Sequence, residues 1–220
     1  MLKEIELFTP LHQSTKRDYT ARVLDNKNEA VTEAEKFDYN YWDGDRRYGY
    51  GGYKYDGRWK IIAQKLIQMY SLNKSSSILD VGCGKAHLLF EIKKIIPEIS
   101  IAGIDISKYA IKNAKEEIRK YLKVSNCIKL DFKDKSFDLV FSFNVLHNLS
   151  IEYLFSAIKE INRVGKTNKL IVLESYTNIN QKNNLLNWQL TCKSFYNKKE
   201  WIWIYNFLNY DGDYEFIYFD

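Results

Sequence analysis

The 220-residue chain is 45% hydrophobic, which supplies enough apolar side chains for the core of one domain, with or without an extension. Its formal net charge is +5, but lysines and acids are interspersed along the chain, so no basic patch typical of nucleic-acid binding stands out. The three widely spaced cysteines indicate neither a disulfide framework nor a metal site, which favours a reduced, cytoplasmic protein. We find no signal-peptide pattern and no apolar run long enough to span a membrane.

The first 58 residues are irregular in pattern. Residues 1–36 indicate short polar helices or coil, with a helix candidate at Asn26–Phe37. Tyr41–Trp59 then holds five of the ten glycines of the chain, interleaved with tyrosines. It has too many glycines for a helix and too many large aromatic residues for a flexible linker. We therefore expect an N-terminal extension over residues 1–58 and a core domain over residues 59–220.

After a first helical pattern, strand and helix patterns alternate from Ser77 onward. Helical spacing marks Trp59–Leu72, His87–Ile96, Ser107–Leu122, the stripe from Ile151 to Ile161, and Lys198–Tyr210. Strands are expected at Ser77–Val81, Ser100–Ile106, near Asn126, and at Phe137–Phe143, Asn168–Ser175 and Tyr214–Phe219. This alternation predicts an α/β fold, with an open, mostly parallel sheet and helices on both faces. Such folds bind ligands at the carboxyl ends of their strands.

The loop after the first of these strands, "LDVGCGKA" (Leu79–Ala86), opens a helix. Gly82 and Gly84 allow a sharp turn and the close approach of a ligand, and the helix start offers free N–H groups. Asp105 ends the next strand, where its carboxylate can accept hydrogen bonds from both hydroxyls of a ribose. A dinucleotide site requires a third glycine where this chain has His87, whereas a small residue after the glycine pair, here Ala86, is typical of S-adenosylmethionine (SAM) enzymes.

Four motifs in order, over about residues 59–176, resemble the class I SAM-dependent methyltransferases, closest to the ubiquinone/menaquinone-pathway branch. They are "ILDVGCGKA", "AGIDIS", "LDFKDKSFDLVFSFNVLHNL" and "EINRVGKTNKLIVLES". The resemblance implies a Rossmann-like fold and SAM as the cofactor. The residues it assigns to the cofactor are Gly82, Cys83, Gly84, Asp105, Ile106, Phe143 and Asn144.

The chain departs from the family pattern at three places. Asn126 stands where the family has an acid that binds the adenine amino group, and its amide oxygen can accept the same hydrogen bond. Cys127 is then expected under the adenine ring. Asn148 replaces the second histidine of the "LHH" pattern, and only one of the two usual C-terminal strands is clear, at Tyr214–Phe219.

In the family, the residues before the first core helix cover cofactor and substrate, so the resemblance implies that Tyr41–Trp59 is a lid. We call it the lid segment. Its glycines permit tight turns, and its tyrosines, among them Tyr50 and Tyr53, supply stiff walls with hydroxyl tips for the substrate. The alternative is an ordered aromatic loop that only caps the sheet.

Two arginine roles are expected in the lid segment. Arg58 or Arg47 could hold the methionine carboxylate of SAM through paired hydrogen bonds. Arg46 and Arg47 could grip an anionic substrate, although adjacent arginines are more often a solvated surface pair.

Methyl transfer is an in-line displacement that can also require removal of a proton. His147, just past a strand, is the best candidate base, and a structural histidine is the alternative. His12 and Tyr19 reach the pocket only if the N-terminus folds back, while Trp188 and Tyr196 lie in an insertion that either walls the substrate pocket or packs in the core.

The leading hypothesis is an enzyme that methylates a small molecule. We expect an anionic or sugar-type substrate that belongs to surface-glycan or secondary metabolism. We expect no nucleic-acid or membrane partner, and a protein that is a monomer or homodimer. An RNA or protein methyltransferase and a non-catalytic SAM-binding module remain alternatives.

Overall fold

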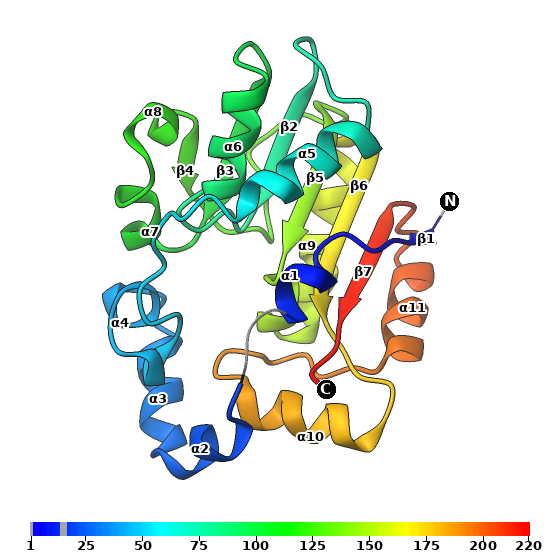
Figure 1. The fold of residues 1–220 in the computed structure, drawn as a ribbon. Helices are drawn as coiled ribbons and strands as arrows, with labels where there is room; N and C mark the ends of the chain where they lie inside the picture. Colours follow the sequence, from blue (N-terminus) through cyan, green and yellow to red (C-terminus); the bar gives the residue numbers. More distant parts are fainter. Residues whose placement is uncertain (1, 14–16) are drawn as a thin grey trace.

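The computed structural model describes residues 2–13 and 17–220. Its strands form one sheet in the order β1-β7-β6-β5-β2-β3-β4, and every pairing is parallel. The strands are β1 (Lys3–Glu4), β2 (Ser77–Val81), β3 (Ser100–Asp105), β4 (Leu122–Val124), β5 (Phe137–Phe143), β6 (Gly165–Glu174) and β7 (Asp213–Ile217). The predicted α/β fold with a parallel sheet is confirmed (Figure 1).

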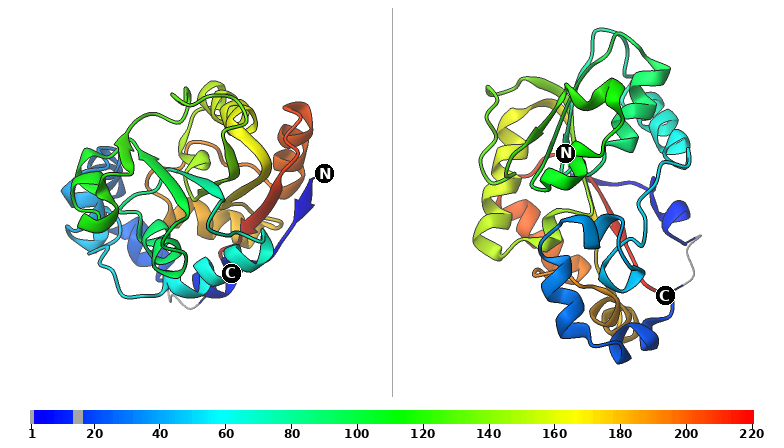
Figure 2. Two further views of the ribbon diagram at one scale, coloured as in Figure 1. Left: turned by 90° about the horizontal axis from the view of Figure 1, so that it is seen from above. Right: turned by 90° about the vertical axis from the view of Figure 1, so that its left-hand side faces the viewer.

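Helices cover both faces of the sheet (Figure 2). On one face, α5 (Trp59–Met69) and α6 (His87–Ile95) pack over Ile78 and Leu139 in one apolar cluster. On the other face, α9 (Ile151–Val164) and α11 (Lys198–Phe207) pack over Leu79 and Val140 in a second cluster. Because successive strand residues point to opposite faces, the continuous apolar runs of the sequence fill both clusters.

The helix expected over Ser107–Leu122 is interrupted, so this prediction was partly wrong. The structure has α7 (Lys108–Lys112) and α8 (Glu116–Arg119) instead. Ser107 does cap α7, because its hydroxyl accepts a hydrogen bond from Ala110 N at 2.9 Å. The interruption places Ile118 in the core beneath α6 and lets the chain begin β4 at Leu122. The apolar spacing alone does not mark this break.

The N-terminus folds back onto the sheet. β1 adds a parallel edge next to β7, which was not expected from the polar sequence of residues 1–36. The buried carboxylate of Glu215 on β7 then accepts hydrogen bonds from the N–H groups of Phe8 and Thr9 at the start of α1 (Thr9–Gln13). The strand β7 thus pairs with β6 on one side and with the N-terminal β1 on the other.

The remaining N-terminal helices lie beyond the carboxyl ends of the strands. They are α2 (Tyr19–Leu24), α3 (Lys27–Ala34), α4 (Tyr39–Trp42) and the 3-10 turn η1 (Arg46–Tyr48). The helix predicted at Asn26–Phe37 is therefore confirmed as α3. Figure 1 shows α2 beside α10 (Ile179–Trp188), the helix of the insertion after β6. Within the described ranges, no helix is both long and apolar enough to cross a bilayer.

Candidate functional site

The glycine turn between β2 and α6 has the backbone that the sequence predicts. Gly82 and Gly84 have φ values of +84° and +55°, in the region that favours glycine. The N–H groups of Gly82 and Cys83 both donate to Ile104 O, at 2.8 and 2.9 Å, which binds the turn to β3. A Cβ atom on Gly82 would lie 2.2 Å from Val145, so the turn cannot accept a side chain there without moving its neighbour.

A cavity of about 140 Å³ lies beside this turn and gathers most of the residues expected to bind the cofactor. Those that line it are Gly82, Asp105, Ile106, Asn126, Cys127, Phe143 and Asn144, joined by Phe37, Tyr41, Trp42 and Tyr50 from the N-terminal extension. Cys127 is buried, and burial raises the pKa of its thiol to about 11. The thiol is therefore protonated at neutral pH and acts as a packing group.

Two polar groups of this smaller cavity already have backbone partners. The Asp105 carboxylate accepts from Gly84 N at 2.7 Å and from Ser107 N at 2.8 Å, and burial nevertheless raises its pKa. The Asn126 Oδ1 atom accepts from Ile128 N at 3.1 Å. A carboxylate or amide oxygen has two lone pairs, so both groups keep acceptor capacity for a ligand.

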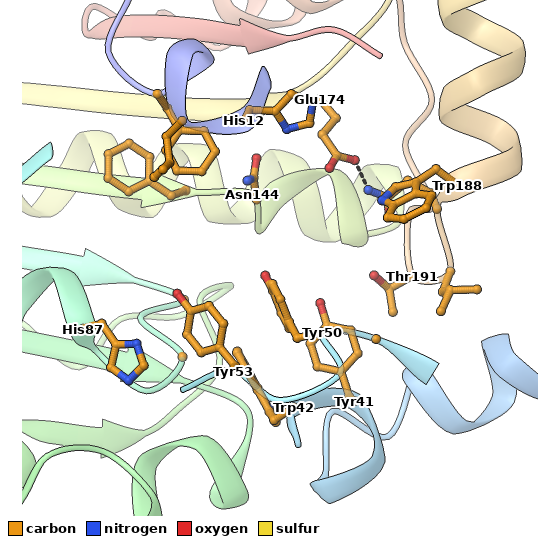
Figure 3. A pocket seen from close by; sticks show the side chains of 18 of the residues that line it. His12, Tyr41, Trp42, Tyr50, Tyr53, His87, Asn144, Glu174, Trp188 and Thr191 are labelled. Atoms are coloured by element: carbon orange, nitrogen blue, oxygen red, sulfur yellow. Dashed lines mark hydrogen bonds between the residues drawn. The ribbon is translucent and has the colours of Figure 1, made fainter. Parts of the chain in front are cut away.

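A second cavity, of about 400 Å³, adjoins the first and shares Gly82, Phe143 and Asn144 with it. Figure 3 shows Tyr41, Tyr50 and Tyr53 on one side of this larger cavity, facing Asn144 and Glu174 on the other. Tyr50 is an exposed residue, but its hydroxyl points into the cavity, and loss of solvent there raises its pKa to about 12.

The fold-back of the N-terminus brings His12 into the larger cavity. The imidazole is buried, packs edge-on against Phe219 at 4.8 Å, and has its pKa lowered to about 4, first by burial and then by Arg17. Tyr19 does not line this cavity but packs at its margin against Trp188, with ring centroids 6.0 Å apart.

His147 lies in the turn η2 (Leu146–Asn148) just after β5 and lines the larger cavity. Burial lowers its pKa to about 3, and no described residue forms a hydrogen bond with its Nδ1 atom. Its Nε2 atom is 3.6 Å from Glu174 Oε2 at the end of β6. Burial raises the pKa of Glu174 to about 8, although Arg17 and a hydrogen bond from Gln189 oppose this. The pair therefore holds a neutral imidazole beside a carboxyl group that is protonated at neutral pH.

Asn144 stands at the junction of the two cavities in a strained conformation. Its φ is +56°, and its N–H donates to Val172 O at 2.8 Å. Its buried Oδ1 atom has no hydrogen-bond partner among the described residues. Backbone strain and an unsatisfied buried acceptor at the same residue are typical of ligand sites.

Sequence reasoning missed two acids of the larger cavity. Glu174 ends β6, so the rule that sites form at the carboxyl ends of strands pointed to it. Asp80 lies on β2 two residues before Gly82, inside the quoted motif. Its side chain is buried, burial raises its pKa, and no hydrogen bond to its carboxyl group is present within the described ranges.

The structure brings only two of the three candidate arginines to the larger cavity. Arg58 lines its rim and donates Nε to Asp56 Oδ2 at 2.6 Å. Arg46 also lines it, with its guanidinium 5.0 Å from the centre of the Trp188 ring. Arg47 instead pairs with Asp25 at 3.0 Å and Glu29 at 3.5 Å, outside both cavities.

Asp43 anchors the lid segment to the glycine turn. Its carboxylate accepts two 2.6 Å hydrogen bonds from the buried Lys85, the lysine of "GCGKA", and one of 2.7 Å from Tyr109. Trp42 donates Nε1 to Ser107 Oγ at 3.0 Å, and its ring would lie 2.7 Å from a Cβ atom on Gly84.

The lid segment also covers α6. Tyr53 stacks on the His87 imidazole, with ring centres 4.9 Å apart and planes 11° apart. This contact gives His87 a packing role in the described structure.

The insertion after β6 divides between the cavity and the core. Trp188, the last residue of α10, lines the larger cavity. Tyr196 instead packs edge-on against the buried Trp201 of α11, at 5.2 Å. Of the two residues considered for the substrate wall, only Trp188 is in position to contact a ligand there.

The family model described as "Methyltransferase domain" matches residues 72–212, more than half of the chain. An uncharacterised methyltransferase of Schizosaccharomyces pombe is 33% identical over 107 residues, covering 43% of this chain and 38% of that protein. The malonyl-[acyl-carrier protein] O-methyltransferase of Legionella pneumophila is 34% identical over 96 residues, covering 41% of this chain and 33% of that protein.

The chain therefore spans less than half the length of these curated relatives. The solved structure of a SAM-dependent methyltransferase from Archaeoglobus fulgidus superposes with a TM-score of 0.53 over 68% of each chain, at 22% identity, and so shares the fold. Together, the matched family model, the glycine turn and the parallel sheet identify the chain as a member of the methyltransferase domain family with the fold of the class I SAM-dependent enzymes.

Proposed function

We propose that this protein transfers a methyl group from SAM to a small molecule, an anionic or sugar-type substrate of surface-glycan or secondary metabolism. The observation that carries this proposal is the pair of adjoining cavities that share Gly82, Phe143 and Asn144. A ligand in the smaller cavity can therefore meet a ligand in the larger one. We further propose that it works in the cytoplasm as a monomer or homodimer.

The chemistry of the cavity walls fits the cofactor. Asp105 offers acceptors for ribose hydroxyls, Asn126 offers one for the adenine amino group, and Ile106 and Cys127 offer apolar surface for the ring. In the larger cavity, the buried Asp80 carboxyl group suits the ammonium group of the methionine arm. Arg58 suits its carboxylate, which it would bind by exchanging Asp56 for the ligand.

When bound, SAM supplies a methyl group on a sulfonium sulfur, which keeps the bonding electron pair as the acceptor takes the methyl group. The chain must orient the acceptor and remove its proton, where it carries one. We propose that the neutral imidazole of His147 takes this proton on a ring nitrogen, and that Glu174 then loses its own proton to solvent, so that its carboxylate pairs with the new imidazolium. Exclusion of water by the lid segment would strengthen these interactions.

The size of the larger cavity supports a small acceptor. About 400 Å³ has to hold both the methionine arm and the acceptor, so the space that remains for the acceptor is that of a small molecule. The hydroxyl groups of Tyr41, Tyr50 and Tyr53 point into this space and can bond sugar hydroxyls, while Arg46 suits an acid.

We propose that residues 1–58 act as a cover over the core of residues 59–220, and that the lid segment moves when the cofactor binds. The contact between Trp42 and Gly84 supports movement, because it leaves no space for a ligand atom against the Gly84 Cα atom. Opening requires release of the bond between Trp42 and Ser107 and of the Asp43–Lys85 ion pair.

The test is methyl transfer from isotopically methyl-labelled SAM into a cell extract, followed by separation into small-molecule, RNA and protein fractions. We expect label in the small-molecule fraction with the wild type and strong loss with His147→Ala. Label in the RNA or protein fraction would identify RNA or protein as the acceptor, in place of a small molecule. SAM binding without transfer to any fraction would favour the non-catalytic module.

A further inference from the structure

Three arginine side chains converge on one indole ring at the wall of the larger cavity. The guanidinium carbons of Arg22, Arg46 and Arg17 lie 4.6, 5.0 and 5.6 Å from the centre of the Trp188 ring. All four residues line the larger cavity. We call them the Trp188 cluster. They come from three distant parts of the chain, so the cluster exists only when the N-terminal extension docks on α10.

The positive charge of two of these arginines is not compensated by a carboxylate. Neither Arg22 nor Arg46 forms an ion pair with any acid of the described ranges. Asp25, which attracts Arg22 at longer range, contacts Arg47 instead. Burial and the nearby Arg46 charge lower the pKa of Arg22 to about 10, so it is still charged at neutral pH. Two like charges held together in a cavity favour the binding of an anion.

The donors of the cluster are only partly used by the protein. Arg22 donates Nη1 to the backbone oxygens of Arg46 and Arg47, at 3.2 and 2.6 Å, and Arg46 donates Nη1 to Gly49 O. Arg17 donates to His12 O at 3.2 Å. Since a guanidinium carries five N–H donors, Arg22 and Arg46 retain donors for a ligand.

Docking of the extension on α10 does not depend on Arg46. Lys27 donates Nζ to Asn187 O at 3.0 Å and to Leu186 O, at the end of α10, and Tyr19 packs edge-on against Trp188. The Arg46 side chain is exposed and, among the described residues, contacts α10 only by stacking on Trp188, without a hydrogen bond to that helix. The position of Arg46 is therefore better suited to binding a ligand than to holding the N-terminal extension on α10.

We propose that Arg22 and Arg46 bind the doubly charged end of the methyl acceptor, which makes the acceptor a small dianion, either a phosphate monoester or a dicarboxylate. This inference rests on the proposed methyltransferase function and narrows its substrate class. Two uncompensated guanidinium groups match two negative charges, and planar guanidinium groups bind both phosphate and carboxylate oxygens in pairs. The His147–Glu174 pair, which lines the same cavity, would then face the part of the acceptor that receives the methyl group.

Calorimetry on the full chain saturated with S-adenosylhomocysteine tests this, at pH 8 and constant ionic strength. The probes are inorganic phosphate and malonate as dianions, with acetate as the monoanion. We expect saturable binding of at least one dianion, at least ten-fold tighter than acetate. Arg46→Met and Arg22→Met should each weaken it about ten-fold, while Lys65→Gln, which removes an exposed charge on α5, should not.

The outcomes separate this inference from the function on which it rests. Binding of phosphate alone identifies a phosphate ester, and binding of malonate alone identifies a dicarboxylate. Absence of saturable dianion binding, or unchanged binding in Arg46→Met, overturns the inference. A parallel loss of S-adenosylhomocysteine affinity in Arg46→Met also overturns it, because the arginine would then hold the cofactor. Failure of the wild type to bind S-adenosylhomocysteine instead refutes the proposed function, and the anion titration can still be run on the chain alone.

Discussion

Replacing Lys85 by Met should release the lid segment while leaving the sheet folded. The Lys85 side chain is 6% exposed and Asp43 is its only acidic partner among the described residues. Methionine keeps most of the length and volume of the side chain, so the packing loss at the start of α6 is small. What is lost is the charged partner of the group that anchors the lid segment.

The magnitude follows from the surroundings of Asp43. Removing one partner of a fully buried ion pair costs about 3–5 kcal/mol. Asp43 is 20% exposed in its side chain and keeps its bonds from Tyr109 Oη and from Tyr53 N, so we expect a smaller cost, about 2 kcal/mol. Since each 1.4 kcal/mol changes an equilibrium ten-fold, the open population of the lid segment should rise about 30-fold.

Limited proteolysis near Gly49–Gly52 measures this population, because the cutting rate follows the open fraction when opening and closing are fast. Lys85→Met should be cut about 30-fold faster than the wild type, and S-adenosylhomocysteine should slow the cut in both. Lys123→Met is the matched control, because Lys123 pairs with Asp131 on an exposed surface. Equal cutting rates in Lys85→Met and the wild type would refute the anchoring role of the ion pair. If S-adenosylhomocysteine does not slow the cut, the lid segment is a fixed cap.

Three further predictions concern single residues. Burial lowers the pKa of His87 from about 6.5 to about 4, so its neutral form stabilises the fold above pH 6.5, and this stability is lost as the pH falls toward 4. In urea titrations, His87→Gln should reduce the pH slope of the unfolding free energy in that window by about 1.4 kcal/mol per unit; an unchanged slope would mean that His87 titrates normally. Asn126→Leu should weaken S-adenosylhomocysteine about ten-fold in calorimetry, whereas Asn126→Asp should not; full tolerance of leucine would mean that packing alone holds the adenine. Arg58→Ala should weaken the binding of SAM more than the binding of adenosine. Equal losses of affinity would show that Arg58 does not bind the methionine carboxylate.

Local motifs explain why the smaller cavity could be predicted from the sequence. Gly82 follows β2 and Asp105 ends β3, and the ends of these neighbouring parallel strands must meet at one edge of the sheet, so the proximity of the two residues follows from the strand order. Asn126 and Asn144 also follow strand ends. For these residues, position along the chain is enough to place them at the same edge of the sheet.

The walls of the larger cavity depend on long-range docking that no local pattern encodes. Arg22 and Trp188 meet because β1 joins β7 and α2 packs on α10, with separations along the chain of more than 150 residues. The strand β1 is two exposed residues, Lys3 and Glu4, so hydrophobic alternation cannot reveal it. Lys85 belongs to the motif "GCGKA", but the motif does not reveal its ion pair, which forms only when the folded lid segment places Asp43 beside it.

The helix break at Asn113 has a different cause. Ala110, Ile111, Ala114 and Ile118 are spaced as on one helix face, and all four are buried. The chain nevertheless has to turn between α7 and α8 to reach β4 within a few residues. Sheet geometry overrides the local propensity here, as tertiary context often does.

Asp105 and the glycine turn are proposed to form a SAM site, and calorimetry with S-adenosylhomocysteine tests this most directly. Asp105→Asn is the sharpest variant, because its amide oxygen can still accept from Gly84 N or Ser107 N but its NH₂ group cannot accept from a ribose hydroxyl. We expect micromolar-range binding by the wild type, at least ten-fold weaker binding by Asp105→Asn, and no binding of NAD. Equal affinities in the wild type and Asp105→Asn, or binding of NAD in place of S-adenosylhomocysteine, would contradict the site assignment.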